Sequence, residues 1–207
     1  MKINKPKFWD KNNQTFFSLI LLPFSYIYFL IITIMKYFKK EKEFSIPIIC
    51  VGNIYVGGTG KTPVCIKLKN LLDDKRLPVV IKKKYRNQKD EIELLRKYSK
   101  LIVCDERHQG ITAAIEKKFD TVILDDGFQD WSIKKDLNII CFNNNQQIGN
   151  GQVLPAGPLR EGLGSLKMVD IVMINGEKNT ELELKLKKYN SYLKFFYFVY
   201  NLKKFEE

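Results

Sequence analysis

A glycine-rich turn between an apolar run and an amphipathic stretch constrains this chain more than any other feature of its sequence. Residues 46–51 read Ile-Pro-Ile-Ile-Cys-Val, and residues 57–62 read Gly-Gly-Thr-Gly-Lys-Thr. Apolar positions then recur between lysines over 64–72, a spacing that predicts a helix packed on one face. The order of strand, glycine loop, Lys-Thr and helix is the context of a phosphate-binding P-loop. We therefore expect an α/β sheet built around this loop.

The predicted loop places several phosphate-binding groups close together. Closely spaced glycines let backbone N–H groups approach phosphate oxygens, and the start of the following helix adds its positive end. We expect Lys61 to reach the β and γ phosphates, and the hydroxyl of Thr62 to ligate Mg²⁺. The strict P-loop spacing asks for glycine where this chain has Tyr55, so the loop is a variant. The residues expected to bind ATP are Tyr55, Val56, Gly57, Gly58, Thr59, Gly60, Lys61 and Thr62.

A second apolar run, 121–124, ends in the two carboxylates Asp125 and Asp126. Carboxylates at the end of a parallel strand lie beside the P-loop in such a sheet, where they can hold Mg²⁺ directly or through water. Adjacent side chains on a strand point in opposite directions, so the sequence leaves open which of the two faces the metal. The alternative for this pair is a solvated Asp-Asp-Gly turn.

Other short apolar runs alternate with stretches that suit helices. This pattern predicts a P-loop NTPase-like, doubly wound and mostly parallel sheet covered on both faces. The expected strands are 77–81, 101–104, 137–142 and 170–174, and the expected helices are 90–99 and 109–118. We divide the chain into a basic and hydrophobic membrane-associated helix, 1–43, a kinase-type α/β domain, 44–176, and a truncated C-terminal segment, 177–207.

The apolar segment 16–35 is as long as the ~20 residues that a helix needs to cross a bilayer. Lysines stand on both sides of it, so the positive-inside rule gives no orientation. Pro23 is expected to kink or interrupt the helix. We favour a helix that lies in one leaflet, and the alternatives are a full span and a helix buried within the protein.

The balance of charge favours an anionic partner. The chain has 35 Lys and Arg against 23 Asp and Glu, a formal charge of +12, and lysines outnumber acidic residues around the apolar segment. Because the excess follows that segment and no recognition motif is present, we expect an anionic membrane surface and no nucleic acid. With 45% apolar and 28% charged residues, a disordered chain is excluded. The sequence does not give the oligomeric state.

Three motifs, in order, resemble the tetraacyldisaccharide 4'-kinase family of lipid A biosynthesis. They are the loop 52–63, the Asp-Asp-Gly-Phe-Gln of 125–129, and the Gly-Asn-Gly and Leu-Pro-Ala-Gly-Pro-Leu-Arg-Glu of 149–161. The resemblance runs to about residue 176. It implies phosphoryl transfer from ATP to the 4' hydroxyl of an acylated disaccharide 1-phosphate. The enzyme would work at the cytoplasmic face of the bacterial inner membrane, as a peripheral or monotopic protein.

The resemblance also implies residue roles. Asp90 stands where the family has the carboxylate that helps to deprotonate the acceptor hydroxyl. Lys61 and Asp126 join it as catalytic residues, and ATP and Mg²⁺ are the expected cofactors. The implied metal ligands are Thr62, Asp125 and Asp126, and the implied substrate-side residues are Glu91, Gln129, Arg160 and Glu161.

The chain departs from the family at three places. Residues 82–85 read Lys-Lys-Lys-Tyr where the family has Ser-Arg-Gly-Tyr, and this run either grips a substrate phosphate or is a solvated basic loop. Asp130 stands in place of a histidine. A second lobe with a Phe-Pro-Asp-His stretch is not in the 207 residues, so we expect weak or absent turnover. The rival functions are a membrane-associated P-loop ATPase switch without a lipid substrate and an inactive remnant.

Overall fold

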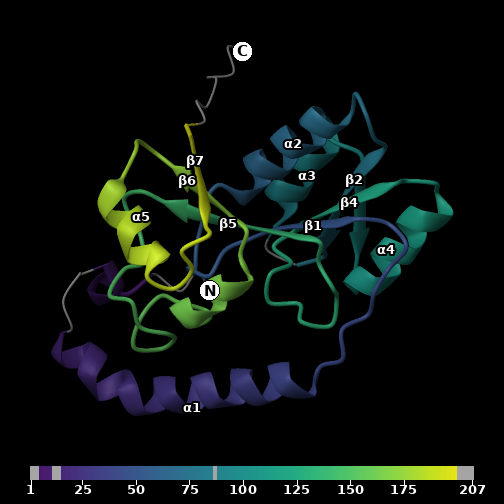
Figure 1. Ribbon diagram of the computed structural model, residues 1–207. Coiled ribbons are helices and arrows are strands. Elements are labelled where there is room, and N and C mark those ends of the chain that lie inside the picture. The colour runs from purple at the N-terminus through teal and green to yellow at the C-terminus, as the bar shows by residue number, and fades with distance from the viewer. Residues whose placement is uncertain (1–4, 11–14, 86–87, 200–207) are drawn as a thin grey trace.

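A seven-stranded parallel sheet forms the centre of the computed structural model, which describes residues 5–10, 15–85 and 88–199 (Figure 1). Its strand order is β3-β2-β4-β1-β5-β6-β7, and every neighbouring pair is parallel. The strands are β1 (Ile48–Gly52), β2 (Pro78–Lys83), β3 (Leu101–Cys104), β4 (Thr121–Asp125), β5 (Leu137–Asn143), β6 (Ile171–Asn175) and β7 (Lys194–Phe198). The predicted doubly wound sheet is therefore confirmed.

Helices cover both faces of the sheet, as the apolar character of its central strands requires. One face is covered by α2 (Lys61–Leu72) and α3 (Lys89–Tyr98), which share a core cluster with β1, β2 and β4. The other face is covered by α4 (Arg107–Glu116), by the 3₁₀ helix η2 (Leu163–Met168) and by α5 (Thr180–Lys187). A short 3₁₀ helix, η1 (Lys7–Asp10), precedes α1.

Two elements that the sequence analysis did not predict follow β6, namely the helix α5 and the strand β7. In α5, Leu182 and Leu186 are its buried residues, and charged side chains fill most other positions, so its periodicity is weak. The side chain of Asn179 caps this helix by accepting the N–H of Leu182 at 2.9 Å. Strand β7 then pairs with β6 at the edge of the sheet. Both elements come from the segment 177–207.

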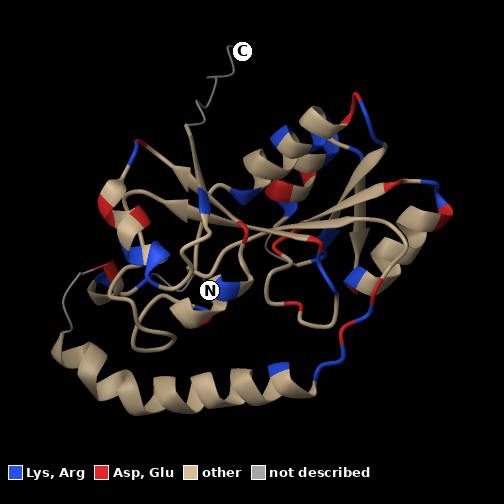
Figure 2. Cartoon of the chain, in the orientation of Figure 1, with Lys and Arg blue, Asp and Glu red and all other residues tan. Residues whose placement is uncertain are grey.

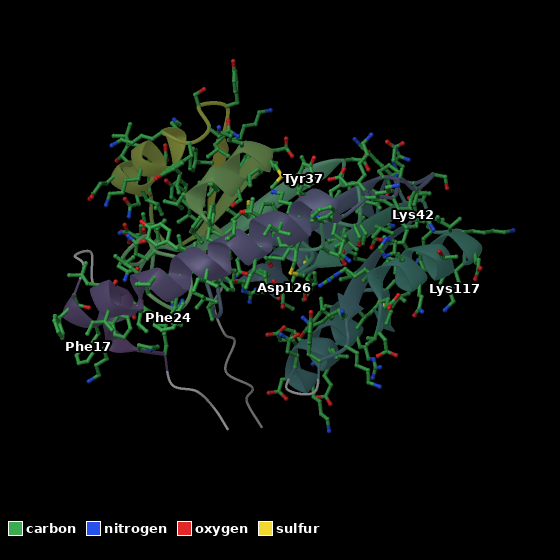
Figure 3. All side chains as sticks on the ribbon, turned by 90° about the horizontal axis from the view of Figure 1, so that it is seen from below. Phe17, Phe24, Tyr37, Lys42, Lys117 and Asp126 are labelled. Atoms are coloured by element: carbon green, nitrogen blue, oxygen red, sulfur yellow. The ribbon has the colours of Figure 1, made fainter. Side chains whose placement is uncertain are left out.

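The apolar N-terminal segment forms one long helix, α1 (Phe16–Phe38), which lies across the face of the molecule below η2 and the long loops (Figures 1 and 3). The helix continues through Pro23, so the predicted interruption is not found. Polar side chains fix it to the protein. Ser18 Oγ donates to the carbonyl of Ala156 at 3.0 Å, and Ser25 Oγ donates to that of Val153 at 3.0 Å.

The remaining surface of α1 is apolar and exposed, so the helix is not buried within the protein. Among the described residues it is the one helix long and apolar enough to cross a membrane. Figure 2 shows it almost free of charge, with lysine near its C-terminal end. The exposed apolar face consists of Phe16, Phe17, Leu19, Ile20, Phe24, Tyr26, Ile27, Phe29, Leu30, Ile31, Ile34, Met35, Tyr37 and Phe38.

Gly52, at the end of β1, lies where the structure leaves no room for a side chain. A Cβ added there would lie 2.5 Å from the Cβ of Phe128, which belongs to the loop after β4. Gly52→Ala is therefore expected to lower the free energy of unfolding by about 1–3 kcal/mol through overpacking. Urea unfolding measures this effect. Gly164→Ala is the control, since an added Cβ there meets nothing within 4 Å, and equal losses in the two variants would contradict the prediction.

Candidate functional site

A cavity of about 480 Å³ opens beyond the C-terminal ends of β1 and β4, at the centre of the sheet. From β1 the chain passes through α2 to β2 on one side, and from β4 it crosses to β5 on the other side of β1. Such a switch point is where open α/β sheets bind ligands. The cavity is lined by Gly57, Gly58, Thr59, Gly60, Lys61, Thr62, Pro63, Gln88, Glu91, Asp126 and Arg160.

The glycine loop wraps around this cavity and leads into α2. Gly60 has φ +87°, a left-handed conformation that glycine adopts without strain, and the helix begins at the next residue. Asn53 holds the loop in shape, because its Nδ2 donates to the carbonyl oxygens of Tyr55 at 2.6 Å and Gly57 at 3.1 Å. The N-terminal turn of α2, with Lys61 and Thr62, therefore faces the cavity with its free N–H groups and positive dipole end.

Two residues of the predicted loop, Tyr55 and Val56, do not line the cavity. The ring of Tyr55 is buried in the core beneath the loop, and its hydroxyl bonds to Lys5 at 2.8 Å and to Asp10. The N–H of Val56 already donates to the carbonyl of Pro158 at 2.9 Å. The side chain that replaces the expected glycine thus points away from the phosphate position, and a nucleotide contact from these two residues stays a prediction.

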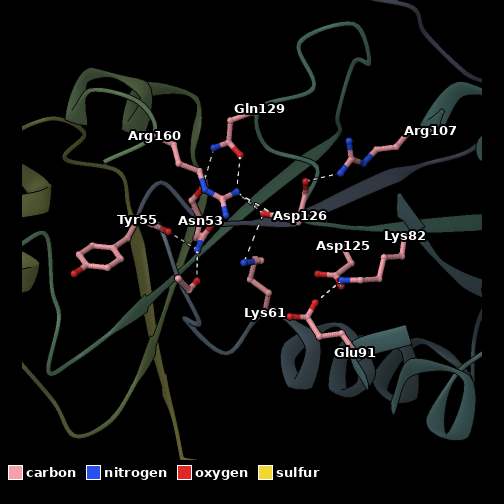
Figure 4. A network of polar contacts seen from close by, with 11 residues as sticks. Asn53, Tyr55, Lys61, Lys82, Glu91, Arg107, Asp125, Asp126, Gln129 and Arg160 are labelled. Atoms are coloured by element: carbon pink, nitrogen blue, oxygen red, sulfur yellow. Dashed lines mark hydrogen bonds and ion pairs between the residues drawn. The ribbon is translucent and has the colours of Figure 1, made fainter. Parts of the chain in front are cut away.

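Of the two adjacent aspartates, Asp126 is the one that lines the cavity, and it lies between Lys61 and Arg160 (Figure 4). Its Oδ1 lies 3.6 Å from Lys61 Nζ, and a guanidinium nitrogen of Arg160 donates to both of its oxygens at 3.0 and 3.2 Å. Arg107 donates to its backbone carbonyl at 2.6 Å. Burial alone would raise the pKa of Asp126, but Lys61 and Arg160 outweigh it and hold the pKa below its usual value. The carboxylate is therefore ionised at neutral pH.

Gln129 connects the glycine loop to Arg160. Its Nε2 donates to the carbonyl of Asn53 at 2.9 Å, and its Oε1 accepts from Arg160 at 3.4 Å. The backbone N–H of Arg160 donates to the carbonyl of Ile54 at 2.6 Å, so the 149–161 motif is fixed to the loop at two points. The three family motifs therefore meet at one place in the fold.

Asp125 is fully buried at the end of β4 and does not line the cavity. Its Oδ2 lies 2.6 Å from the ammonium nitrogen of Lys82, and the same nitrogen lies 2.6 Å from Glu91 Oε2. Burial lowers the pKa of Lys82, but the two carboxylates raise it by more, so the pKa lies above its usual value. The lysine is therefore charged. Burial raises the pKa of Asp125, a shift that Lys82 partly offsets. Lys82 thus lies in the site, where it is neither solvated nor open to a substrate phosphate.

The remaining predicted residues lie at different depths around the cavity. Asp90 is exposed in the first turn of α3 and does not line the cavity, whereas its neighbour Glu91 does. Glu161 is buried behind the loops, and burial raises its pKa. Asp130, in place of the family's histidine, lies 3.3 Å from the guanidinium of Arg107.

Four residues of this network were not assigned as site residues: Asn53, Lys82, Gln88 and Arg107, of which Lys82 was named only within the basic run 82–85. A signal existed for two of them. Asn53 is a polar residue between a buried strand and its glycine loop, and Lys82 is a lysine directly after the apolar run of β2. Gln88 and Arg107 come from segments whose sequence carries no motif, and only the packing of α3 and α4 brings them to the site.

The lowered pKa of Asp126 predicts how this residue stabilises the fold as the pH changes. In the unfolded chain the pKa returns toward its ordinary 3.8, so the ionised form stabilises the folded protein above that pH. This contribution is lost as the pH falls from 3.8 toward the lower pKa of the folded state. Urea unfolding from pH 7 to pH 3 measures the difference between wild type and Asp126→Asn, which should shrink in that window. A difference that stays constant or grows would contradict the prediction.

Comparison with known proteins places these motifs in one family. The family model for LpxK, tetraacyldisaccharide-1-P 4'-kinase, matches residues 17–204. The tetraacyldisaccharide 4'-kinase of Pelagibacter ubique (strain HTCC1062) is 48% identical over 186 residues, which cover 89% of this chain and 59% of that protein. The enzyme of that name from Wigglesworthia glossinidia brevipalpis is 36% identical, over 81% of this chain and 53% of its own.

A solved structure agrees with the sequence matches. The crystal structure of LpxK from Aquifex aeolicus in complex with ATP superposes with a TM-score of 0.66 at 33% sequence identity. The superposition covers 76% of this chain and 58% of that one. The chain thus spans between half and three fifths of the length of the relatives named here.

Proposed function

Because the chain belongs to the tetraacyldisaccharide-1-P 4'-kinase family, we propose that it transfers the γ-phosphoryl group of ATP to the 4' hydroxyl of an acylated disaccharide 1-phosphate. One observation carries the proposal. The glycine loop, the ammonium of Lys61, the carboxylate of Asp126 and the guanidinium of Arg160 converge on one cavity at the switch point of the sheet. Phosphoryl transfer needs this combination of positioning and charge.

The residues around the cavity suit a triphosphate and its metal. The amides of the loop and the start of α2 would bind phosphate oxygens, with Lys61 at the β and γ phosphates. Thr62 and Asp126, which both line the cavity, offer a hydroxyl and a carboxylate, the oxygen ligands that Mg²⁺ prefers. When bound, Mg²⁺ neutralises charge on the transferring group. Asp125, the third predicted ligand, is buried and does not line the cavity, so we propose that it affects the metal without contacting it directly.

On the acceptor side, Asp90 is the proposed base. It lies on the exposed edge of α3, one residue from Glu91, so an acceptor approaching over the rim of the cavity can reach it. The base would take the proton of the attacking hydroxyl as the new O–P bond forms, while the bond from the γ-phosphorus to the bridging oxygen breaks and ADP leaves. Arg160 and Gln129, joined at 3.4 Å, would orient the acceptor and the γ-phosphate, and Glu91 and Glu161 complete the proposed substrate-side set.

The proposed location is the cytoplasmic face of the bacterial inner membrane. The polar contacts of Ser18, Ser25 and Tyr28 hold α1 along the protein, which supports an in-plane helix over a full span. The outward face is apolar and would enter the headgroup region, while lysines beside it would meet anionic lipid. Tyr28 OH also donates to the carbonyl of Arg160 at 2.9 Å, so the membrane helix directly contacts the substrate-side motif.

A single-turnover assay tests the proposal. The 207-residue chain, in excess over γ-³²P-ATP, is mixed with micelles that contain a tetraacylated disaccharide 1-phosphate. We expect slow, Mg²⁺-dependent appearance of ³²P in the lipid, because the enzyme need not turn over. Label released only as phosphate, at a rate that the lipid does not change, would contradict the proposal and would favour an ATPase switch.

A further inference from the structure

A lysine lies buried at the end of β2, between two carboxylates that come from different elements (Figure 4). The side chain of Lys82 is 2% exposed, and its nitrogen lies 2.6 Å from Asp125 of β4 and 2.6 Å from Glu91 of α3. The neighbouring lysines differ from it, because Lys83 is only half-buried and Lys84 is exposed. A buried lysine beside a phosphate-binding loop requires a reason that a surface lysine does not.

The two carboxylates form an arrangement that a cation must occupy. The ionised form of a buried carboxylate such as Asp125 is strongly unfavourable unless an opposite charge pairs with it. Two carboxylate oxygens that both contact one atom are also the donor set with which a divalent cation is bound in proteins. Here that atom is a nitrogen of the chain itself. The other carboxylate oxygen of Asp125 has no hydrogen-bond partner among the described residues.

We propose that the ammonium of Lys82 is a built-in cation of this site, which occupies the position between Asp125 and Glu91 that a divalent cation would otherwise take. It is a positioning residue, since it does not line the cavity. It has two effects. It keeps Asp125 out of the metal's coordination, so that Asp126 is the carboxylate left to face nucleotide-bound Mg²⁺, and it clamps the first turn of α3 to the end of β4.

The clamp matters because no residue in the first turn of α3, 89–92, is fully buried. Leu95 is the one fully buried residue of this helix, and it lies in the second half. Gln88 and Glu91, at the start of the helix, form part of the cavity wall. The ion pair with Lys82 therefore fixes one wall of the nucleotide cavity. This inference does not depend on the lipid acceptor, so its test is separate from the kinase assay.

Binding of Mn²⁺ without nucleotide, followed by electron paramagnetic resonance, tests the first effect. In Lys82→Ser the two carboxylates lose their cation, and we expect Mn²⁺ to bind about tenfold more tightly, or better, than to wild type. Lys83→Ser is the matched control. It removes an adjacent lysine of the same strand, whose side chain points to the opposite face, and should leave Mn²⁺ affinity unchanged. Equal affinities in wild type and Lys82→Ser would overturn the proposal.

Hydrogen exchange of the first turn of α3 tests the clamp. Glu91→Gln breaks the ion pair at a side chain that is 47% exposed, so the fold should tolerate it. The N–H groups of 92–95 donate to the carbonyls of 88–91 and so report whether the first turn is formed. We expect their exchange to speed up about tenfold in Glu91→Gln and in Lys82→Ser, and not in Lys83→Ser. Saturating Mn²⁺ should slow it again in Lys82→Ser but not in Glu91→Gln, which lacks the second carboxylate. Unchanged exchange in Glu91→Gln would overturn the clamp even if Lys82→Ser failed to fold.

Discussion

Replacing Lys61 by alanine is expected to weaken binding of Mg·ATP by about a hundredfold or more, because it removes the charged group that faces the phosphate position. Lys61 lies at the first position of α2, and its nitrogen is 3.6 Å from Asp126. The variant loses a cation and leaves Asp126 less compensated, so repulsion between this carboxylate and the triphosphate adds to the loss. Titration with a fluorescent ATP analogue measures the change.

Lys67→Ala is the control for this experiment. Lys67 lies on the same helix, is exposed, and does not line the phosphate cavity. It removes the same charge from the protein, so any general effect of net charge on nucleotide affinity would be seen in both variants. Equal losses of affinity in Lys61→Ala and Lys67→Ala would show that the cavity is not the nucleotide site.

Two aspartates placed on the outer face of α1 are expected to lower binding to anionic vesicles by about a hundredfold or more. Phe24 and Ile31 are 58% and 51% exposed, and neither makes a polar contact that the fold needs. Each loses the ~1.5–3 kcal/mol that burying such a side chain in lipid would give, and each adds a charge that the surface repels. Co-sedimentation of Phe24→Asp/Ile31→Asp with vesicles that contain phosphatidylglycerol measures the effect.

Leu184→Asp is the control for the membrane prediction. Leu184 is 62% exposed on α5, away from α1, so it presents as much apolar surface without belonging to the proposed membrane face. This variant should bind vesicles as wild type does. Wild-type binding by the α1 double variant would show that the helix does not enter the lipid.

The sequence predicted the centre of the sheet because apolar patterning there is strong. Strands β1, β2 and β4 are buried along nearly their whole length, so each reads as an apolar run, and the P-loop follows the first of them. The positions of Lys61, Thr62 and Asp126 followed from the loop and from the end of β4, and all three line the cavity. Motif and strand together therefore located this part of the site.

The rest of the site depends on contacts between segments far apart in the chain. Lys82 follows an apolar run, and sequence patterning cannot show that Asp125 and Glu91 converge on it. The sequence also could not show which of Asp125 and Asp126 lines the cavity. That depends on the turn after β4, where Asp126 adopts φ +57°. Local propensity does not encode either feature, since tertiary packing decides both.

Edge elements were missed for a different reason. In α5 charged residues dilute the apolar positions, and β7 lies at the edge of the sheet, where burial is partial. Such elements gain their stability from the sheet they join, so their own sequence carries a weak signal. The burial of Tyr55 beneath the loop also depends on distant segments, since the residue contacts Asp10 of η1 and pairs with Leu159 of the 149–161 motif.

The cavity at the ends of β1 and β4 is expected to bind ATP together with Mg²⁺. Calorimetric titration of the folded 207-residue chain with ATP, in the presence and absence of Mg²⁺, tests it most directly. We predict saturable binding of one ATP per chain that Mg²⁺ strengthens and that Lys61→Ala abolishes at the same concentrations. Absence of ATP binding by protein shown to be folded, with Mg²⁺ present, would contradict the account.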